Sequence, residues 1–144
     1  MKLQKSTRYA LCAAVELAAA KPDETVTATS VAERFAIPGS VVAKVFQQLV
    51  RGGIAVGTRG QRGGYRLARD PDAVSMLDVI DVFEPRRSPT PGDDLALAPR
   101  GALRLRQVFD EVEEQERCTF ASISLATLTR GPDSLGPTPI VGIV

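Results

Sequence analysis

The chain has 144 residues, a mass of 15.4 kDa and a net charge of +1, and its 44% hydrophobic and 24% charged content is typical of a folded domain. It contains no histidine and two cysteines, Cys12 and Cys118, which excludes catalytic Ser–His and Cys–His pairs, zinc fingers and a disulfide framework. No apolar stretch approaches the roughly 18 residues that span a membrane, and the amino terminus lacks a signal-peptide pattern. We therefore expect a cytoplasmic protein without a membrane segment.

The first third of the chain is predicted to hold two helices. A helix over Ser6–Lys21, capped by Ser6, is apolar almost all round, which is typical of a helix buried in the core of its domain. The β-branched stretch 25–27 predicts a brief strand. Thr29 or Ser30 is then expected to cap a second helix ending at Phe35, because a glutamate follows Ser30 at the spacing of a capping box.

A third helix and a hairpin follow. Residues 36–39 form a tight break, and Ser40 is expected to cap a helix that Gly52-Gly53 ends. Its apolar residues recur at helical spacing and are predicted to face the core: Val42, Val45, Phe46 and Leu49. Two short strands, 54–58 and 65–68, are predicted on either side of a loop rich in glycine and arginine.

The second half of the chain is predicted to be helical between Pro-rich and Gly-rich segments. Ser75 caps a predicted helix that reaches Phe83, an apolar stripe predicts a long helix from about Arg100 to Arg117, and a short helix is expected near 124–129. We therefore divide the chain into a domain over 1–83, a Pro-rich loop over 84–99, a helical region over 100–130 and a Gly/Pro-rich tail over 131–144.

The order of these elements in the first half describes a winged helix-turn-helix. A helix of about three turns fits the major groove of DNA with its amino-terminal residues at base edges. Residues 1–70 hold eleven Lys and Arg against five Asp and Glu, a balance of +6, whereas the remaining residues hold seven against twelve, a balance of −5. A basic half indicates a polyanionic partner. Winged helices also serve as protein-interaction modules, and this alternative stays open.

Five segments also match one protein family in their order along the chain. They are Lys5-Ser6-Thr7-Arg8-Tyr9-Ala10-Leu11, Ser30-Val31-Ala32-Glu33-Arg34-Phe35-Ala36-Ile37-Pro38, Phe46-Gln47-Gln48-Leu49-Val50-Arg51-Gly52-Gly53-Ile54, Arg59-Gly60-Gln61-Arg62-Gly63-Gly64-Tyr65-Arg66-Leu67 and Val74-Ser75-Met76-Leu77-Asp78-Val79-Ile80. Together they resemble the bacterial Rrf-two type of winged-helix transcription regulators, closely over 1–84 and more loosely to residue 129. The resemblance implies a mainly α fold with a small β-hairpin, built as a winged helix-turn-helix domain plus a long dimerisation helix. It also implies a homodimer on double-stranded DNA.

The resemblance further implies which residues contact DNA. The recognition helix would begin at Ser40, and the helix and wing positions that match the family are Ser40, Val41, Ala43, Lys44, Gln47, Arg59, Gly60, Gln61 and Arg62. Ala43 departs from relatives that carry a base-reading glutamate there, and Gln61-Arg62 replaces a common Pro-Gly pair. More of these contacts are expected to phosphates than to bases.

The long helix is expected to hold the dimer together. Leu105, Phe109 and Val112 form an apolar stripe that a short domain has little left to cover, and such stripes usually pack against a partner. The opposite face carries Asp110 and several glutamates, which solvent can cover.

The segment before the long helix, where relatives of this family bind their signal-sensing cluster, departs furthest from the family pattern. Relatives that hold an iron–sulfur cluster place three cysteines in the loop before the long helix, and the matching stretch 84–106 contains none. Cys12 is predicted to be a small core hydrophobe, and Cys118 is predicted to be inert because it lies among carboxylates. We therefore expect no metal, cluster or other cofactor and no enzymatic activity. The prediction is a homodimeric repressor whose signal is a small ligand, a partner protein or a redox event at Cys118.

Overall fold

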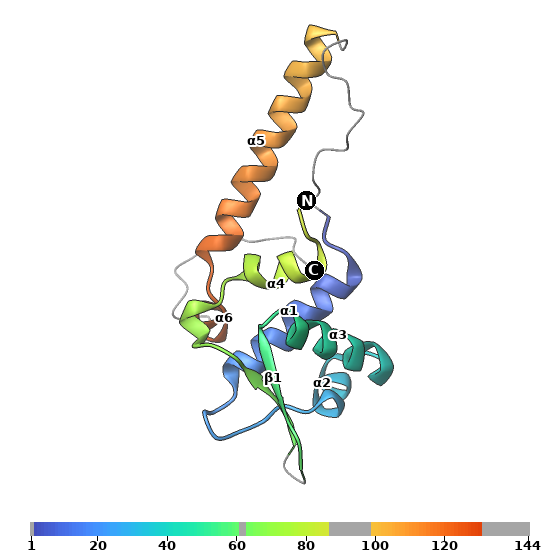
Figure 1. Ribbon diagram of the computed structural model, residues 1–144, viewed down its shortest axis with the longest axis vertical. Coiled ribbons are helices and arrows are strands. Elements are labelled where there is room, and N and C mark those ends of the chain that lie inside the picture. Colours follow the sequence, from blue (N-terminus) through green and yellow to red (C-terminus); the bar gives the residue numbers. More distant parts are fainter. Residues whose placement is uncertain (1, 61–62, 87–98, 131–144) are drawn as a thin grey trace.

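The computed structural model describes residues 2–60, 63–86 and 99–130. Helices α1 to α4 and a two-stranded hairpin form the body of the molecule, and the long helix α5 projects away from it at the end opposite the hairpin (Figure 1). The structure confirms the predicted fold class, which is mainly helical with one small antiparallel sheet in a winged helix-turn-helix. In the described part of the chain, no helix is both long and apolar enough to cross a membrane.

Helix α1 (Lys5–Ala19) lies at the centre of the body, where α3, α4 and α6 all contact it. One face is fully buried and consists of Thr7, Ala10, Ala13, Ala14 and Leu17. The predicted cap at Ser6 is wrong, because the helix begins one residue earlier and Gln4 precedes it without a side-chain cap. The backbone amide of Gln4 instead donates to Glu84 Oε2 at 3.3 Å. The start of α1 is therefore bonded to a residue 80 positions later in the sequence rather than to a local side-chain cap.

Helix α2 (Ala28–Phe35) begins at an earlier cap than the sequence suggested. Thr27 accepts a hydrogen bond from the Ser30 amide at 3.1 Å, so the cap is Thr27 rather than Thr29 or Ser30. The helix ends at Phe35, and Ala36 follows it as the C-cap with a φ of 51°, in the left-handed region. The predicted strand at 25–27 is reduced to an isolated bridge, in which Val26 pairs with Tyr65.

Helix α3 (Gly39–Arg51) carries the predicted core face. Val42, Val45, Phe46 and Leu49 are all buried, as their spacing indicated. The helix starts after Pro38, whose carbonyl accepts from the amides of Val41 and Val42, so Ser40 lies inside the first turn and is not the cap. The helix ends at Arg51 and is followed by Gly52 as its C-cap and then by Gly53, which has a φ of 75°.

The wing consists of β1 (Ala55–Thr58) and β2 (Gly64–Leu67), paired antiparallel with Ala55 opposite Leu67. Val26 extends this sheet, because its amide donates to the Tyr65 carbonyl at 2.8 Å and its carbonyl accepts from the Tyr65 amide at 2.7 Å. A Cβ at Gly64 would come within 2.9 Å of the Val26 carbonyl oxygen. Glycine at this position is therefore required by the close approach of a neighbouring backbone.

Past the wing, a 3-10 turn (Pro71–Ala73) leads into helix α4 (Met76–Phe83). Ser75 caps α4 as predicted, in a capping box with Asp78. Helix α5 (Arg100–Ser122) is longer than the predicted 100–117, and Ser124 caps the short helix α6 (Leu125–Thr129). The predicted loop 84–99 falls largely outside the described residues, and the tail 131–144 does so entirely.

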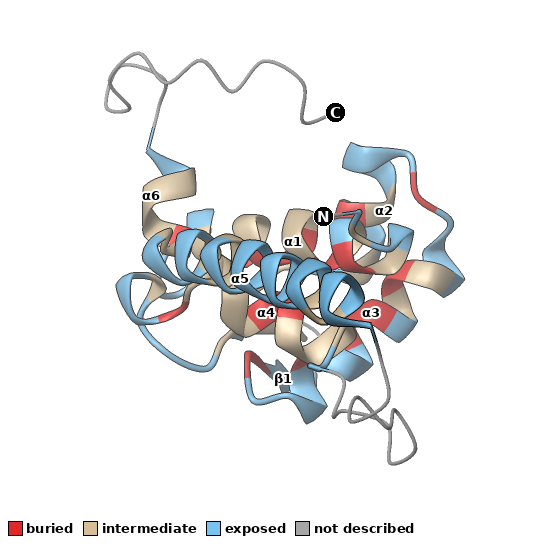
Figure 2. Ribbon diagram, turned by 90° about the horizontal axis from the view of Figure 1, so that it is seen from above, coloured by how far each residue is buried: buried red, intermediate tan, exposed pale blue. Residues whose placement is uncertain are grey.

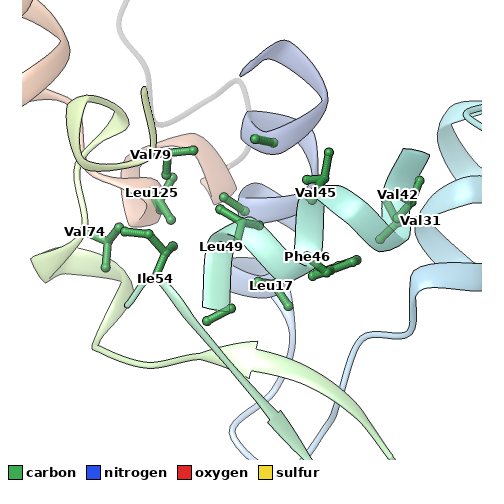
Figure 3. Close-up of a cluster of buried hydrophobic side chains, with 14 of the residues drawn as sticks. Leu17, Val31, Val42, Val45, Phe46, Leu49, Ile54, Val74, Val79 and Leu125 are labelled. Carbon is green, nitrogen blue, oxygen red and sulfur yellow. The ribbon is translucent and has the colours of Figure 1, made fainter. Parts of the chain in front are cut away.

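The hydrophobic core contains residues from α1 and α3, early in the sequence, and from α6, more than 70 residues later. Figure 3 shows Leu125 of α6 beside Val74, Val79 and Ile54, in one cluster with the buried residues of α3. The amide of Leu125 donates to the carbonyl of Val74, and the amide of Met76 donates to that of Ile123, both at 2.8 Å. These bonds surround a bridge between Ser75 and Ser124. Helix α6 therefore completes the same core that α1 and α3 form.

Candidate nucleic-acid interface

The outer face of α3 lies opposite its buried face. Ser40, Lys44 and Gln47 follow one another at helical spacing and are all exposed, whereas Val41 and Ala43 are half-buried at the sides. Within the described part of the chain, the side chains of Ser40, Lys44 and Gln47 make no hydrogen bond or ion pair. Arg51 continues this face by one turn and is also exposed. A polar face without internal partners leaves its donors and acceptors available to a ligand.

The wing tip begins at Arg59, which is exposed directly after β1. Gly60 has a φ of 122°, and its carbonyl accepts from the Gly63 amide at 2.9 Å, which closes a tight turn. A Cβ at Gly63 would come within 2.7 Å of the Gly60 carbonyl oxygen, so this turn needs glycine. Gln61 and Arg62 lie outside the described residues.

Phe46 connects the wing to α3. Its ring lies on the core side of the helix and stacks on the ring of Tyr65 in β2, with centroids 4.3 Å apart and an interplanar angle of 8°. Phe46 is fully buried, and Tyr65 is half-buried. The stack therefore holds the hairpin at a set position beside α3, and the hairpin extends from the body to the end of the molecule farthest from α5 (Figure 1).

Helix α5 has no buried residue, and Figure 2 shows most of its length coloured as exposed. The predicted dimer residues Leu105, Phe109 and Val112 are 55%, 64% and 48% exposed. Val108, which lies between them on the helix, is exposed as well. An uncovered apolar stripe of this length is unusual for a monomer.

Comparison with known proteins identifies this arrangement. The family model described as Rrf2, iron-dependent transcriptional regulator, matches residues 3–131. The chain belongs to the Rrf2 family of DNA-binding helix-turn-helix transcriptional regulators. It is 36% identical over 138 residues to the HTH-type regulator BadM of Rhodopseudomonas palustris, which covers 93% of this chain and 85% of BadM. It is 34% identical over 86 residues to IscR of Cereibacter sphaeroides, covering 58% of this chain and 56% of that protein.

Solved structures show the same fold. This Rrf2 regulator superposes on the oxidised form of CymR from Staphylococcus aureus with a TM-score of 0.74 at 21% identity, over 91% of this chain and 98% of that one. It superposes on IscR of T. potens with a TM-score of 0.72 at 24% identity, over 89% of this chain and 85% of that one. The family assignment also agrees with the expectation that the protein is not an enzyme.

The donor set of this Rrf2 chain does not fit the iron named in the family description. Thiolates and imidazoles are the ligands of iron–sulfur clusters, and the whole sequence offers two cysteines and no histidine. Cys12 is half-buried on α1 and Cys118 is exposed on α5, so they belong to different elements. Burial raises the pKa of the Cys12 thiol, and Glu16 adds to the rise, which disfavours the thiolate that a metal requires. Among the described residues, no three acidic, cysteine or histidine side chains gather as metal ligands.

Proposed function

We propose that this Rrf2 regulator binds DNA as a cluster-free homodimer. The amino-terminal half of α3 enters the major groove, and Arg59 at the wing enters the neighbouring minor groove. The observation that carries the proposal is the exposed face of Ser40, Lys44 and Gln47, which lies opposite the core and has no internal partner in the described structure. A helix held by its apolar face and free on its polar face has the geometry of a recognition helix. We propose that five further residues contact the DNA beside these positions: Val41, Ala43, Gly60, Gln61 and Arg62.

The second half of the proposal concerns assembly. Leu105, Phe109 and Val112 form the interface with the same residues of a second copy, which places two recognition helices on two half-sites. A dimer that covers its operator in this way represses the adjacent gene, and it works in the cytoplasm where the chromosome lies. Its signal enters as a small ligand, a partner protein or a redox event at Cys118.

The helix and the wing are expected to contribute to DNA binding in different ways. Arg59→Ala should weaken binding to all duplexes together, because a guanidinium in the minor groove responds to groove width and potential. Ser40→Ala and Gln47→Ala should change the preference among duplexes, and a lost base contact should cost about 1–3 kcal/mol at one position. Titration of fluorescent duplexes selected from a random library measures both effects.

These titrations also separate the proposal from the alternative of a protein-interaction module. DNA binding predicts an affinity that falls steeply with salt, and Lys44→Gln should reduce the salt slope by about one phosphate contact. Unchanged affinity in Arg59→Ala at moderate salt would remove the wing from the minor groove. Weak binding to all duplexes with little salt dependence would favour the protein-interaction module.

The cluster-free state has its own test. We expect colourless protein after anaerobic purification, and DNA binding that iron chelators and nitric oxide leave unchanged, because two cysteines per chain fall short of the usual four thiolates of a cluster. Absorption spectra and iron analysis measure the first expectation, and gel shifts measure the second. A visible cluster band that disappears in Cys118→Ser would contradict the proposal.

A further inference from the structure

Arg117 joins α5 to the DNA-binding body through a two-pronged ion pair. Its Nη1 donates to Oδ1 of Asp81 on α4 at 2.8 Å, and its Nη2 donates to Oδ2 at 3.0 Å. The Arg117 side chain is 14% exposed and that of Asp81 is 39% exposed. The hydrogen bond to Asp81 raises the pKa of Arg117 further, so the guanidinium stays charged. Two parallel hydrogen bonds from a planar guanidinium to one carboxylate fix the relative orientation of the two side chains as well as their distance.

The residue next to Asp81 contacts the chain at the end of α3, the proposed recognition helix. Val82 of α4 packs against Gly52, directly after the last residue of α3, and a Cβ at Gly52 would collide with Val82 Cγ2. Gln48 and Arg51 of α3 border the same groove as Asp81 and Val82. Two consecutive residues of α4 therefore contact the recognition helix on one side and α5 on the other.

A second attachment lies at the end of α5. The backbone bonds Met76–Ile123 and Leu125–Val74 anchor the chain just past the last residue of this helix. Ile123 follows Arg117 by six residues, which is about 9 Å along a helix. Two separated attachments determine the direction of a rod, whereas one alone leaves it free to swing. Arg86 and Glu114 form a third contact at 3.1 Å, but their side chains are 62% and 54% exposed, so solvent weakens it.

We infer that the Arg117–Asp81 pair is a positioning device that sets the angle of α5 against the body, and through it the spacing of the two DNA half-sites that the dimer accepts. The inference rests on the proposed dimeric function, because the angle affects spacing only where α5 meets a second copy. Phe109, in the middle of the proposed interface, lies eight residues or about 12 Å along α5 from Arg117, so a swing of about 10° moves it by about 2 Å in each copy and by about 4 Å between the two copies. This displacement exceeds the rise of one base pair, about 3.4 Å. The two-fold axis applies the same change to both copies.

Arg117→Gln tests the inference, with Glu114→Gln as the matched control on the same helix. Wild-type protein first selects its best palindromic duplex from a random library, and duplexes with one base pair added or removed between the half-sites are then titrated. Wild-type protein and Glu114→Gln should lose about tenfold or more in affinity on the altered duplexes, a difference of about 1.4 kcal/mol. Arg117→Gln should discriminate by less than about threefold, because its α5 can swing to either spacing.

The outcomes distinguish this inference from the function on which it depends. If wild-type protein is a monomer, or its selected duplex has no two-fold repeat, the proposed function fails before the variants are compared. If wild-type protein has a spacing optimum and folded Arg117→Gln keeps it, the positioning role is wrong. Circular dichroism and sedimentation establish that each variant is folded and dimeric. Should Arg117→Gln unfold, Asp81→Asn, which keeps the size of the side chain, takes its place with the same two outcomes.

Discussion

Replacing Phe109 by glutamate is expected to convert the protein to monomers and to lower its affinity for a two-half-site operator by roughly a hundredfold or more. Phe109 is 64% exposed on α5, between Leu105 and Val112 on the same stripe. In a symmetric dimer both copies would place a carboxylate in an apolar interface, and an unpaired buried charge costs several kcal/mol. Without the dimer, the second half-site no longer binds as part of the same complex, and avidity of about 10²–10⁴ is lost.

Sedimentation at micromolar concentration and titration of the selected duplex measure the two effects. Asp110→Asn is the matched control, because it changes a charge on the neighbouring residue, which is also exposed. It should leave both the assembly and the affinity unchanged. A dimeric Phe109→Glu protein would show that α5 is not the interface.

Replacing Phe46 by alanine is expected to lower the free energy of unfolding by about 3–5 kcal/mol, the cost of a large cavity in a core. Phe46 is fully buried on α3 and stacks on Tyr65 at 4.3 Å. The stack alone adds about 0.5–1.5 kcal/mol beyond the burial of its area. Because the same ring supports β2, the wing should also lose its place beside α3, and DNA affinity should fall at temperatures where the variant remains folded.

Phe35→Ala is the matched control for this experiment. Phe35 is the same residue type on α2, but it is 38% exposed, so its removal should cost about 1 kcal/mol or less. Urea unfolding at one protein concentration compares the three proteins, since the stability of a dimer depends on concentration. Equal losses in both variants would mean that the core around Phe46 does not hold the body together.

The sequence by itself determined the elements whose signals are local. The buried face of α3 followed from four apolar residues at helical spacing, and the cap of α4 followed from Ser75 with Asp78 three residues later. The strands of the wing lie within one residue of their predicted ends, because glycines mark the turn between two β-branched or aromatic runs. The family match rested on such local segments, and the comparison confirms it.

Tertiary structure decided what depends on residues far apart in the chain. Several neighbouring Ser and Thr side chains can cap α2, and in the structure the cap is Thr27 rather than Thr29 or Ser30. The residue before it, Val26, pairs with Tyr65 of the wing, a contact that is distant in sequence. The pairing of Ser75 with Ser124 lies just past the end of α5 at Ser122, beyond its predicted end at residue 117, and α6 then buries Leu125 in the core. No local pattern reveals that Arg117 meets Asp81, because a salt bridge across 36 positions exists only once both helices have packed.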